Sequence, residues 1–458
     1  MNKEASKYPS YIPSGIDWLG EIPAHWQLKP LKYVVDIDSE KLKDSEDPDL
    51  EIEYIDISSV DSGGNILKRE KLIFENAPSR ARRVVQVGDT ILATVRTYLR
   101  AITQIDYDSD LPQICSTGFA VLRPVNIHDR YLFYWVRSDY FIDEIVSRSV
   151  GVSYPAISSS EVGNLHIPIT PIEEQKAIAT FLDQQTTRID QLIEKKKRLL
   201  ELLDEQRQAI ITYAVTKGIN PDVSLKDSGI DWLGEVPVHW DVTKVKRVGS
   251  IKYGLCEPPE KMDGGLPFIR ATDIFRGIIN SEKIQYINPD AVPWTRNPEL
   301  KAKDILVVRS GAYTGDSAIV PPEFEGAIAG YDMVFTCNQV IPEFIANAFL
   351  SKYILEAQFH VARSRAAQPH LNAEELGNCT LLLPPIPEQK KIINFLSHKK
   401  EQIDQLKSKI QTAIDRLEEY RSSLITQAVT GKIDVRDTIH EVEMSYAAEE
   451  GELYKTNK

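Results

Sequence analysis

The sequence predicts an α+β fold made of two copies of one unit, in which a mixed α/β domain precedes a long helix. The phrase SGIDWLGEIPAHW at residues 14–26 returns as SGIDWLGEVPVHW at residues 228–240, an offset of 214 residues. At the same offset and without a gap, residues 170–219 and 384–433 are identical at about 22 of 50 positions. Because both ends of the unit repeat in one register, the sequence indicates an internal duplication.

The repeated opening phrase is aromatic and apolar, and it stays constant while the sequence that follows it changes. It should therefore serve something that the two halves share. We expect its tryptophans to dock each domain against the long helices or a partner protein: Trp18, Trp26, Trp232 and Trp240. Plain core packing is the alternative interpretation.

About 140 residues separate the phrase from the long helix in each half, and there only a skeleton of similarity survives. Short β-branched runs such as residues 87–96 and 302–311 predict strands, and residues 131–141 and 344–354 predict one helix in each half. A shared frame with different loops is typical of a binding module with two specificities.

The last part of each half follows a proline-bearing stretch and carries apolar residues at steps of three and four, which predicts a coiled-coil helix. About 43 residues of helix would span roughly 60 Å. The predicted helix seam consists of Ile189, Leu192, Leu199, Leu203, Ile210, Ile403, Leu406, Ile410, Leu417 and Leu424. A coiled coil that serves only oligomerisation is the alternative.

The 458 residues suffice for two or three domains, and the hydrophobic and charged fractions of 42% and 26% are those of an ordinary folded protein. The chain has no apolar run of membrane-spanning length and no signal-peptide core, so we expect a cytoplasmic protein with no membrane partner. Four scattered cysteines favour a reducing compartment without a disulfide or zinc site.

Motifs of the common catalytic sites are missing from the sequence. There is no phosphate-binding GxxxxGK[ST] loop and no HExxH, and a loose nuclease-like pattern at residues 289–301 has no counterpart in the first half. The sequence therefore predicts a non-enzyme with no catalytic residues, no metal and no cofactor.

The net charge of −13 argues against a nucleic-acid partner, but the charge is unevenly distributed. Residues 36–61 hold about eleven acidic residues, and lysines and arginines then follow almost without acid up to Arg100. Since exposed charges more than about 10 Å apart are largely screened, we expect the acidic loops to face away from a basic surface.

The repeated SGIDWLGE phrase, GDTIL at residues 88–92, and the pattern PIxEQKxIxxFL before each long helix resemble the specificity (S) subunit of type I restriction–modification enzymes. The resemblance extends from about residue 10 to 435. It implies two target recognition domains joined by two long antiparallel coiled-coil helices, with an internal pseudo-twofold repeat. It also implies a non-catalytic subunit that reads a split, asymmetric site in double-stranded DNA. The implied partners are two methyltransferase (M) subunits and restriction (R) subunits, which methylate adenine or cleave DNA.

The resemblance and the repeat together give the expected domain boundaries. These are recognition domain 1 at 12–168, a central spacer helix at 169–216, a linker at 217–227, recognition domain 2 at 228–382, a distal spacer helix at 383–433, and an acidic tail at 434–458 that we expect to be disordered.

We expect DNA contacts in loops that differ between the halves and carry side chains able to bond to phosphates or base edges. In the first half these are Arg96, Thr97, Tyr98, Arg100, Ser153 and Tyr154. In the second half they are Arg309, Ser310, Tyr313, Thr314, Arg363, Arg365, Gln368 and His370. Two alternatives stay open, a non-catalytic coiled-coil scaffold and an orphan recognition subunit without active partners.

Overall fold

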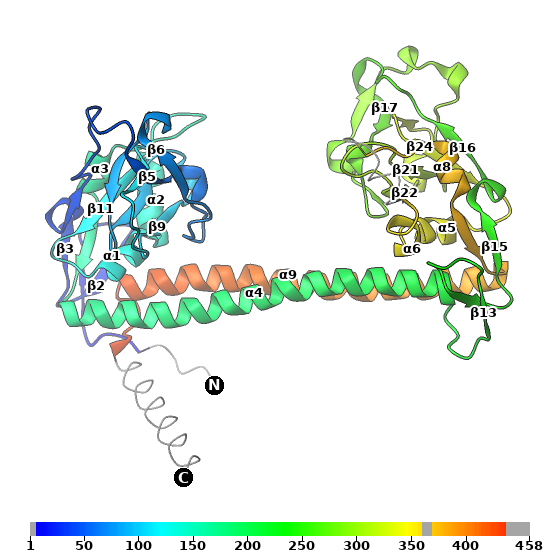
Figure 1. The fold of residues 1–458 in the computed structure, drawn as a ribbon. Coiled ribbons are helices and arrows are strands. Elements are labelled where there is room, and N and C mark those ends of the chain that lie inside the picture. Colours follow the sequence, from blue (N-terminus) through cyan, green and yellow to red (C-terminus); the bar gives the residue numbers. More distant parts are fainter. Residues whose placement is uncertain (1–5, 360–368, 437–458) are drawn as a thin grey trace, which may run out of the picture. The chain divides into compact units, whose positions relative to one another are not determined.

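The short β-branched runs form strands in both halves of the chain (Figure 1). The computed structural model describes residues 6–359 and 369–436. These residues divide into a first unit, within 1–195 and 412–458, and a second unit, 196–411. Each unit therefore takes its domain from one half of the sequence and its long helices from both. Within the described ranges, no helix is both long enough and apolar enough to span a membrane.

The first domain consists of two four-stranded sheets, two strand pairs and three short helices. In chain order its elements are β1 (Tyr11–Pro13), β2 (Glu21–Pro23), β3 (Gln27–Pro30), β4 (Val35–Ile37), β5 (Glu51–Ile55), β6 (Glu70–Ile73), β7 (Ala81–Val85), β8 (Thr90–Ala93), β9 (Ile102–Gln104), β10 (Gln113–Ser116), β11 (Phe119–Pro124), α1 (Asp129–Val136), α2 (Asp139–Arg148), α3 (Ser159–Asn164) and β12 (His166–Ile169). The sheets have the strand orders β6-β5-β10-β7 and β4-β11-β8-β9, and the pairs are β1-β2 and β12-β3. All pairings are antiparallel except β10 with β5.

The second domain follows the same plan. Its elements are β13 (Leu225–Asp227), β14 (Glu235–Pro237), β15 (Asp241–Lys244), β16 (Gly249–Tyr253), β17 (Lys261–Ile269), β18 (Ile274–Phe275), β19 (Ile278–Ile279), β20 (Gln285–Ile287), β21 (Ile305–Val307), β22 (Ser317–Ile319), β23 (Ile328–Ala329), β24 (Met333–Cys337), α5 (Pro342–Phe349), α6 (Lys352–Leu355), α8 (Ala373–Asn378) and β25 (Thr380–Leu383). The sheet β16-β24-β21-β22 matches β4-β11-β8-β9, and β20-β17-β23 keeps one parallel pair, β17 with β23. The duplication read from the sequence is thus present in the topology.

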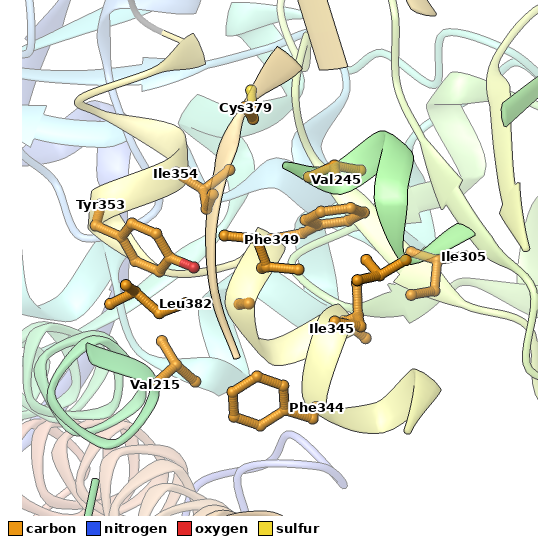
Figure 2. Packing of buried hydrophobic residues seen from close by; sticks show 14 of the residues in the cluster. Val215, Val245, Ile305, Phe344, Ile345, Phe349, Tyr353, Ile354, Cys379 and Leu382 are labelled. Atoms are coloured by element: carbon orange, nitrogen blue, oxygen red, sulfur yellow. The ribbon is translucent and has the colours of Figure 1, made fainter. Parts of the chain in front are cut away.

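The core of the second domain forms where α5 meets the sheet and the end of the long helix. Pro342 at the start of α5 has no N–H to leave unsatisfied, which favours a helix start there. The buried face of α5 carries Phe344, Ile345 and Phe349, which pack in one cluster with Val215 of the long helix (Figure 2). This packing positions the domain on its helix.

Two long helices, α4 (Ile172–Lys217) and α9 (Ile386–Val429), run antiparallel. In the first unit the beginning of α4 lies against the end of α9, and Arg421 pairs with Asp190 at 2.5 Å. In the second unit the end of α4 lies against the beginning of α9, and Arg207 pairs with Asp404 at 3.4 Å. The two ion pairs are related by the offset of 214 residues. The predicted fold class, two mixed domains with two long antiparallel helices, is confirmed.

The buried stripe of these helices has the predicted period, but it differs from the predicted seam at alternate positions. The predicted residues Ile189, Leu203, Ile403, Ile410 and Leu424 are buried. Ile210 and Leu417 are half-buried. Leu192, Leu199 and Leu406 are 47%, 42% and 44% exposed. The residue after each of these three lies further inside: Ile193, Leu200 and Lys407. The choice by hydropathy failed at Lys407 because a lysine stem can pack while its ammonium group donates to Asp204 at 2.7 Å.

Replacing Ile193 with alanine is expected to lower the free energy of unfolding by about 2 kcal/mol, because the side chain leaves a cavity in the buried stripe. Leu192→Ala removes a side chain of the same size from the neighbouring exposed position and is expected to cost less than about 0.5 kcal/mol. Chemical denaturation of both variants measures the difference. Equal losses would contradict the observed stripe.

A glycine and a lysine end each long helix and tie it to the opening phrase of a domain. In the second unit Lys217 donates to the carbonyl oxygen of Glu235, and in the first unit Lys432 donates to that of Glu21 at 2.7 Å. Glu21 and Glu235 are equivalent positions of the repeat, although lysine and glycine stand in opposite order in TKGI and TGKI. Residues 430–433 therefore join the end of α9 to the first domain in the same way as residues 216–219 join the end of α4 to the second.

Candidate nucleic-acid interface

The Glu-Gln pair in the EQK motif fixes each domain to the first turn of its helix. In the first unit, Glu174 accepts hydrogen bonds from Trp26 Nε1 at 3.0 Å and Thr170 Oγ1 at 2.5 Å, and it contacts His25 Nε2 at 2.8 Å. Gln175 Oε1 accepts a hydrogen bond at 2.9 Å from the backbone N–H of His128, the residue that precedes α1. These contacts hold the domain in a set position, so its loops project from a rigid base.

The second unit repeats the arrangement with one difference. Glu388 contacts His239 Nε2 at 2.6 Å. Gln389 Oε1 accepts a hydrogen bond at 3.0 Å from the backbone N–H of Ile341, the residue that precedes α5. The indole N–H of Trp240 is buried and has no hydrogen-bond partner among the described residues. In both halves the EQK motif thus bonds the start of the long helix to the domain, a role that sequence reasoning did not assign.

The predicted tryptophans divide into two kinds. Trp26 and Trp240 are 2% and 0% exposed, whereas Trp18 and Trp232 are 36% and 47% exposed. Trp18 lies 5.7 Å from the ring of Tyr140. The buried pair therefore packs in the interior of each unit, and the exposed pair has surface free for a partner.

Arg96 lies at the centre of the first candidate loop. The residue follows β8 with a left-handed backbone (φ 53°), and its N–H donates to the carbonyl oxygen of Pro155 at 2.8 Å. Its guanidinium stacks 4.5 Å above the ring of Tyr154. Tyr154 is 60% exposed and Ser153 is also exposed, so three of the predicted residues meet at the surface.

The other predicted residues of this loop differ in accessibility. Tyr98 is 53% exposed, but Thr97 is 5% exposed and shares a hydrogen bond with Ser149 at 2.9 Å. Arg100 pairs with Asp139 at 2.7 Å, and Asp139 also accepts from Ser422 of α9. Thr97 and Arg100 therefore hold the loop in place, while Arg96 and Tyr98 are presented to solvent.

The predicted separation of acidic loops from a basic surface is wrong for several arginines of the first domain. Arg83 pairs with Asp38 at 2.8 Å and Arg82 with Asp44 at 3.3 Å. The acidic stretch thus neutralises part of the basic stretch, because residues 40–42 run beside β7, with an isolated bridge between Lys41 and Arg83. Arg96 has no carboxylate partner among the described residues, which leaves its charge available.

Arg309 follows β21, the strand equivalent to β8, but its place in the fold is that of Thr94, two positions before Arg96. Leu371 donates to the carbonyl oxygen of Arg309 as Ile157 donates to that of Thr94, so Arg309 stands where Thr94 does. Its guanidinium lies between two rings, 4.5 Å from Tyr253 and 4.2 Å from Tyr331. This arrangement holds a positive charge on a stacked aromatic platform.

A buried carboxyl group lies beneath this platform. Asp332 is 1% exposed and accepts the backbone N–H of Arg309 at 3.2 Å. Burial raises the pKa of Asp332 to about 6, although the N–H and the charge of Arg309 act in the opposite direction. The second oxygen of the carboxyl has no hydrogen-bond partner among the described residues. The pKa of this carboxyl therefore lies well above that of an exposed aspartate.

The remaining predicted residues of the second domain lie around Arg309. His370 Nε2 is 3.3 Å from its guanidinium, and Ser310 pairs with His370 across an isolated bridge. Tyr313 is 48% exposed and meets Phe275 edge to face at 6.3 Å. Thr314 is buried and bonds to the carbonyl oxygen of Gly311. Arg363, Arg365 and Gln368 lie outside the described residues.

Sequence reasoning missed three aromatic residues of this cluster. Tyr253 ends β16, Tyr331 precedes β24, and Phe275 ends β18. Phe275 is 54% exposed, and Tyr253 and Tyr331 are 40% and 42% exposed. The sequence signal that could have identified them is an aromatic residue at the end of a predicted strand. Within the part of the chain that is described, no group of three or more His, Cys, Asp or Glu side chains could hold a metal ion.

Comparisons with known proteins point to one family. Its model, described as type I restriction modification DNA specificity domain, matches residues 23–202 and 237–416. The chain is 26% identical over 439 residues to the putative type I restriction enzyme MjaX specificity subunit of Methanocaldococcus jannaschii, with 91% of this chain and 96% of that protein covered. It is 23% identical over 335 residues to the type I restriction enzyme EcoKI specificity subunit of Escherichia coli (strain K12), with 70% of each covered.

A solved structure has a similar fold. It is described as "Structural basis underlying complex assembly and conformational transition of the type I R-M system". The TM-score is 0.66 at 22% identity, and the match covers 90% of this chain and 99% of the other.

Proposed function

Because the chain belongs to the family of type I restriction–modification specificity subunits, we propose that it reads a split, asymmetric DNA sequence, one part with each domain. The observation that carries the proposal is the contrast between the two loop clusters. The sheet that carries each cluster is duplicated, as β4-β11-β8-β9 and β16-β24-β21-β22, but Arg96 stacks on a single tyrosine and Arg309 lies between two. Different groups on equivalent frames would read different bases, so the two parts of the site would differ.

The domain boundaries that we propose are those of the sequence, 12–168 and 228–382, with the spacer helices at 169–216 and 383–433. Arginine is the residue that most often reads guanine, and exposed tyrosine, serine and histidine bond to phosphates or base edges. We assign DNA contacts to Arg96, Tyr98, Ser153 and Tyr154 in the first domain and to Arg309, Ser310, Tyr313 and His370 in the second. Thr97, Arg100 and Thr314 would act by holding these loops.

Alanine at Arg96 or Arg309 is expected to weaken binding of the specific DNA by about 1–3 kcal/mol and to relax preference in one part of the site only. Fluorescence anisotropy with DNA altered in either part measures both effects. Lys391→Ala, which removes an exposed positive charge from α9, is the control and should leave preference unchanged. Loss of preference in both parts from one substitution would contradict the assignment.

The partners in this proposal are two methyltransferase subunits and restriction subunits, which carry out adenine methylation and cleavage. The chain itself would be non-catalytic. The exposed Trp18 and Trp232 offer equivalent surfaces in the two halves, which suits two identical partners. No cofactor is assigned to the chain.

Methylome sequencing of cells that express the chain with its methyltransferase subunit tests the proposal. The expected result is a split motif with adenine methylated in both parts, which disappears when this chain is omitted. A soluble, assembled complex without new methylation would overturn it and favour a coiled-coil scaffold or an orphan recognition subunit.

A further inference from the structure

A pocket of about 180 Å³ opens in the second unit between α4, α9 and α5, beside β22 and the turn that precedes β19. Apolar side chains from three helices line it: Ile211, Leu350, Leu396 and Ile403. Four cationic residues also line it: Arg207, Arg276, Lys399 and Lys400. None of the DNA-contact residues proposed above lines the pocket.

The duplication shows what the pocket lacks. Asn347 of α5 lines it, and the equivalent residue of α1 in the first unit is Tyr134, because each stands six residues after the backbone N–H that is bonded to the glutamine of the EQK motif. Tyr134 is 2% exposed, and the guanidinium of Arg130 lies 5.2 Å from the centre of its ring. Asn347 instead donates its amide N–H to the carbonyl oxygen of Glu343 at 2.7 Å. At this position the fold thus holds a phenol ring in one copy and a shorter polar side chain in the other.

The size of the pocket matches the missing ring. An apolar protein cavity of about 150 Å³ holds one benzene molecule, so 180 Å³ accommodates a single six-membered ring. Apolar burial would stabilise the ring, and the nearby cationic groups would be attracted to the face of the ring, as Arg130 is to that of Tyr134.

The charge of the lining selects an anion. Glu343 is the acidic residue of the lining, and it is paired with Lys303 at 2.9 Å. Arg207 is paired with Asp404 at 3.4 Å, which leaves three cationic residues of the lining in excess. We propose that this pocket binds a single aromatic ring that carries an anionic group, the chemistry of an aromatic carboxylate.

Ligand-observed NMR of the full chain with phenylacetate tests the site. Phenethylamine, which has the same ring and the opposite charge, is the matched probe. Phenylacetate is expected to bind at least tenfold more tightly, and higher salt is expected to weaken it. Failure of phenylacetate to bind, or equal binding of both probes, would overturn the proposal.

Asn347→Phe places a ring in the pocket at the position that Tyr134 occupies in the first unit, and it is expected to weaken phenylacetate binding at least tenfold. Asn347→Ala, which leaves the pocket open, is the control and should bind as the unchanged chain does. Thermal unfolding shows that both variants are folded. Unchanged binding by a folded Asn347→Phe variant would place the ligand elsewhere and overturn the proposal.

The natural ring comes either from a free small molecule or from an aromatic residue beside a carboxylate in a partner chain. This distinction rests on the proposed function, since it uses the assembled complex with the methyltransferase subunit. If the partner supplies the ring, assembly abolishes phenylacetate binding, and Asn347→Phe weakens assembly at least tenfold. If a small molecule supplies it, the complex still binds phenylacetate and the variant assembles normally. Either result upholds the site and identifies its source.

Discussion

Replacing Gly254 with alanine is expected to cost the second domain at least about 3 kcal/mol of unfolding free energy and to abolish its part in DNA recognition. A Cβ at this position would lie 1.9 Å from the carbonyl oxygen of Gly330 and 2.6 Å from that of Ala329. Both atoms belong to the backbone, so no side-chain rotation relieves the clash. The neighbouring Tyr253 and Tyr331 flank Arg309, and forcing the two strands apart would take this cluster apart as well.

Chemical denaturation measures the stability of the variant, and methylome sequencing measures which part of the site it still reads. Gly264→Ala, in the same domain, is the matched control, because its Cβ would meet nothing within 4 Å. Its left-handed backbone (φ 74°) gives an expected cost of only about 1 kcal/mol. Equal stability of the two variants would contradict the claim that the close approach of the backbone at Gly254 requires a glycine.

Replacing Glu174 with glutamine is expected to cost about 3 kcal/mol of unfolding free energy, because the carboxylate collects several hydrogen bonds in a buried place. The side chain is 6% exposed and accepts from Trp26 and Thr170. Glu388→Gln is the matched variant of the second unit. Its side chain is 22% exposed and the indole of Trp240 gives it no hydrogen bond, so the expected cost is about half as large.

The same carboxyl group gives the first unit a pH dependence. Burial raises the pKa of Glu174, but the hydrogen bonds from Thr170, His25 and Trp26 outweigh burial and leave the pKa below its ordinary value. A lowered pKa means that the stabilisation is present above the unfolded-state value of about 4.3 and is lost as the pH falls through the folded-state pKa. Unfolding curves between pH 6 and pH 3 should therefore converge for the unchanged chain and Glu174→Gln. A constant difference over this range would show that the charge is not involved.

The family resemblance stated from the sequence is confirmed, and so are the two mixed domains and the paired helices. These features were predictable because they depend on local sequence patterns that occur in both halves. The helix seam was predicted less well, because hydropathy favours Leu406 over Lys407 for the buried position. The buried stem of Lys407 and its bond to Asp204, about 200 residues away in the chain, decide otherwise.

The candidate DNA interface was less accessible to sequence reasoning, because its residues come together only in the folded sheet. Tyr253, Arg309 and Tyr331 come from three different strand ends, and no spacing rule links them. The pairing of Arg83 with Asp38 likewise depends on the segment after β4 running beside β7 in the fold. The contacts assigned to DNA stay predictions, for which the arginine substitutions are the test.

The lysine contacts that close both units bear on the order of the two halves in the chain. Since Lys432 meets Glu21 as Lys217 meets Glu235, a covalent link between the halves has an equivalent place at either junction. A circular permutant that joins residue 436 to residue 6 through a short peptide and opens the chain within residues 220–224 keeps every one of these contacts. Such a rearrangement would change the order of the two domains in the chain while each unit keeps its own helix packing.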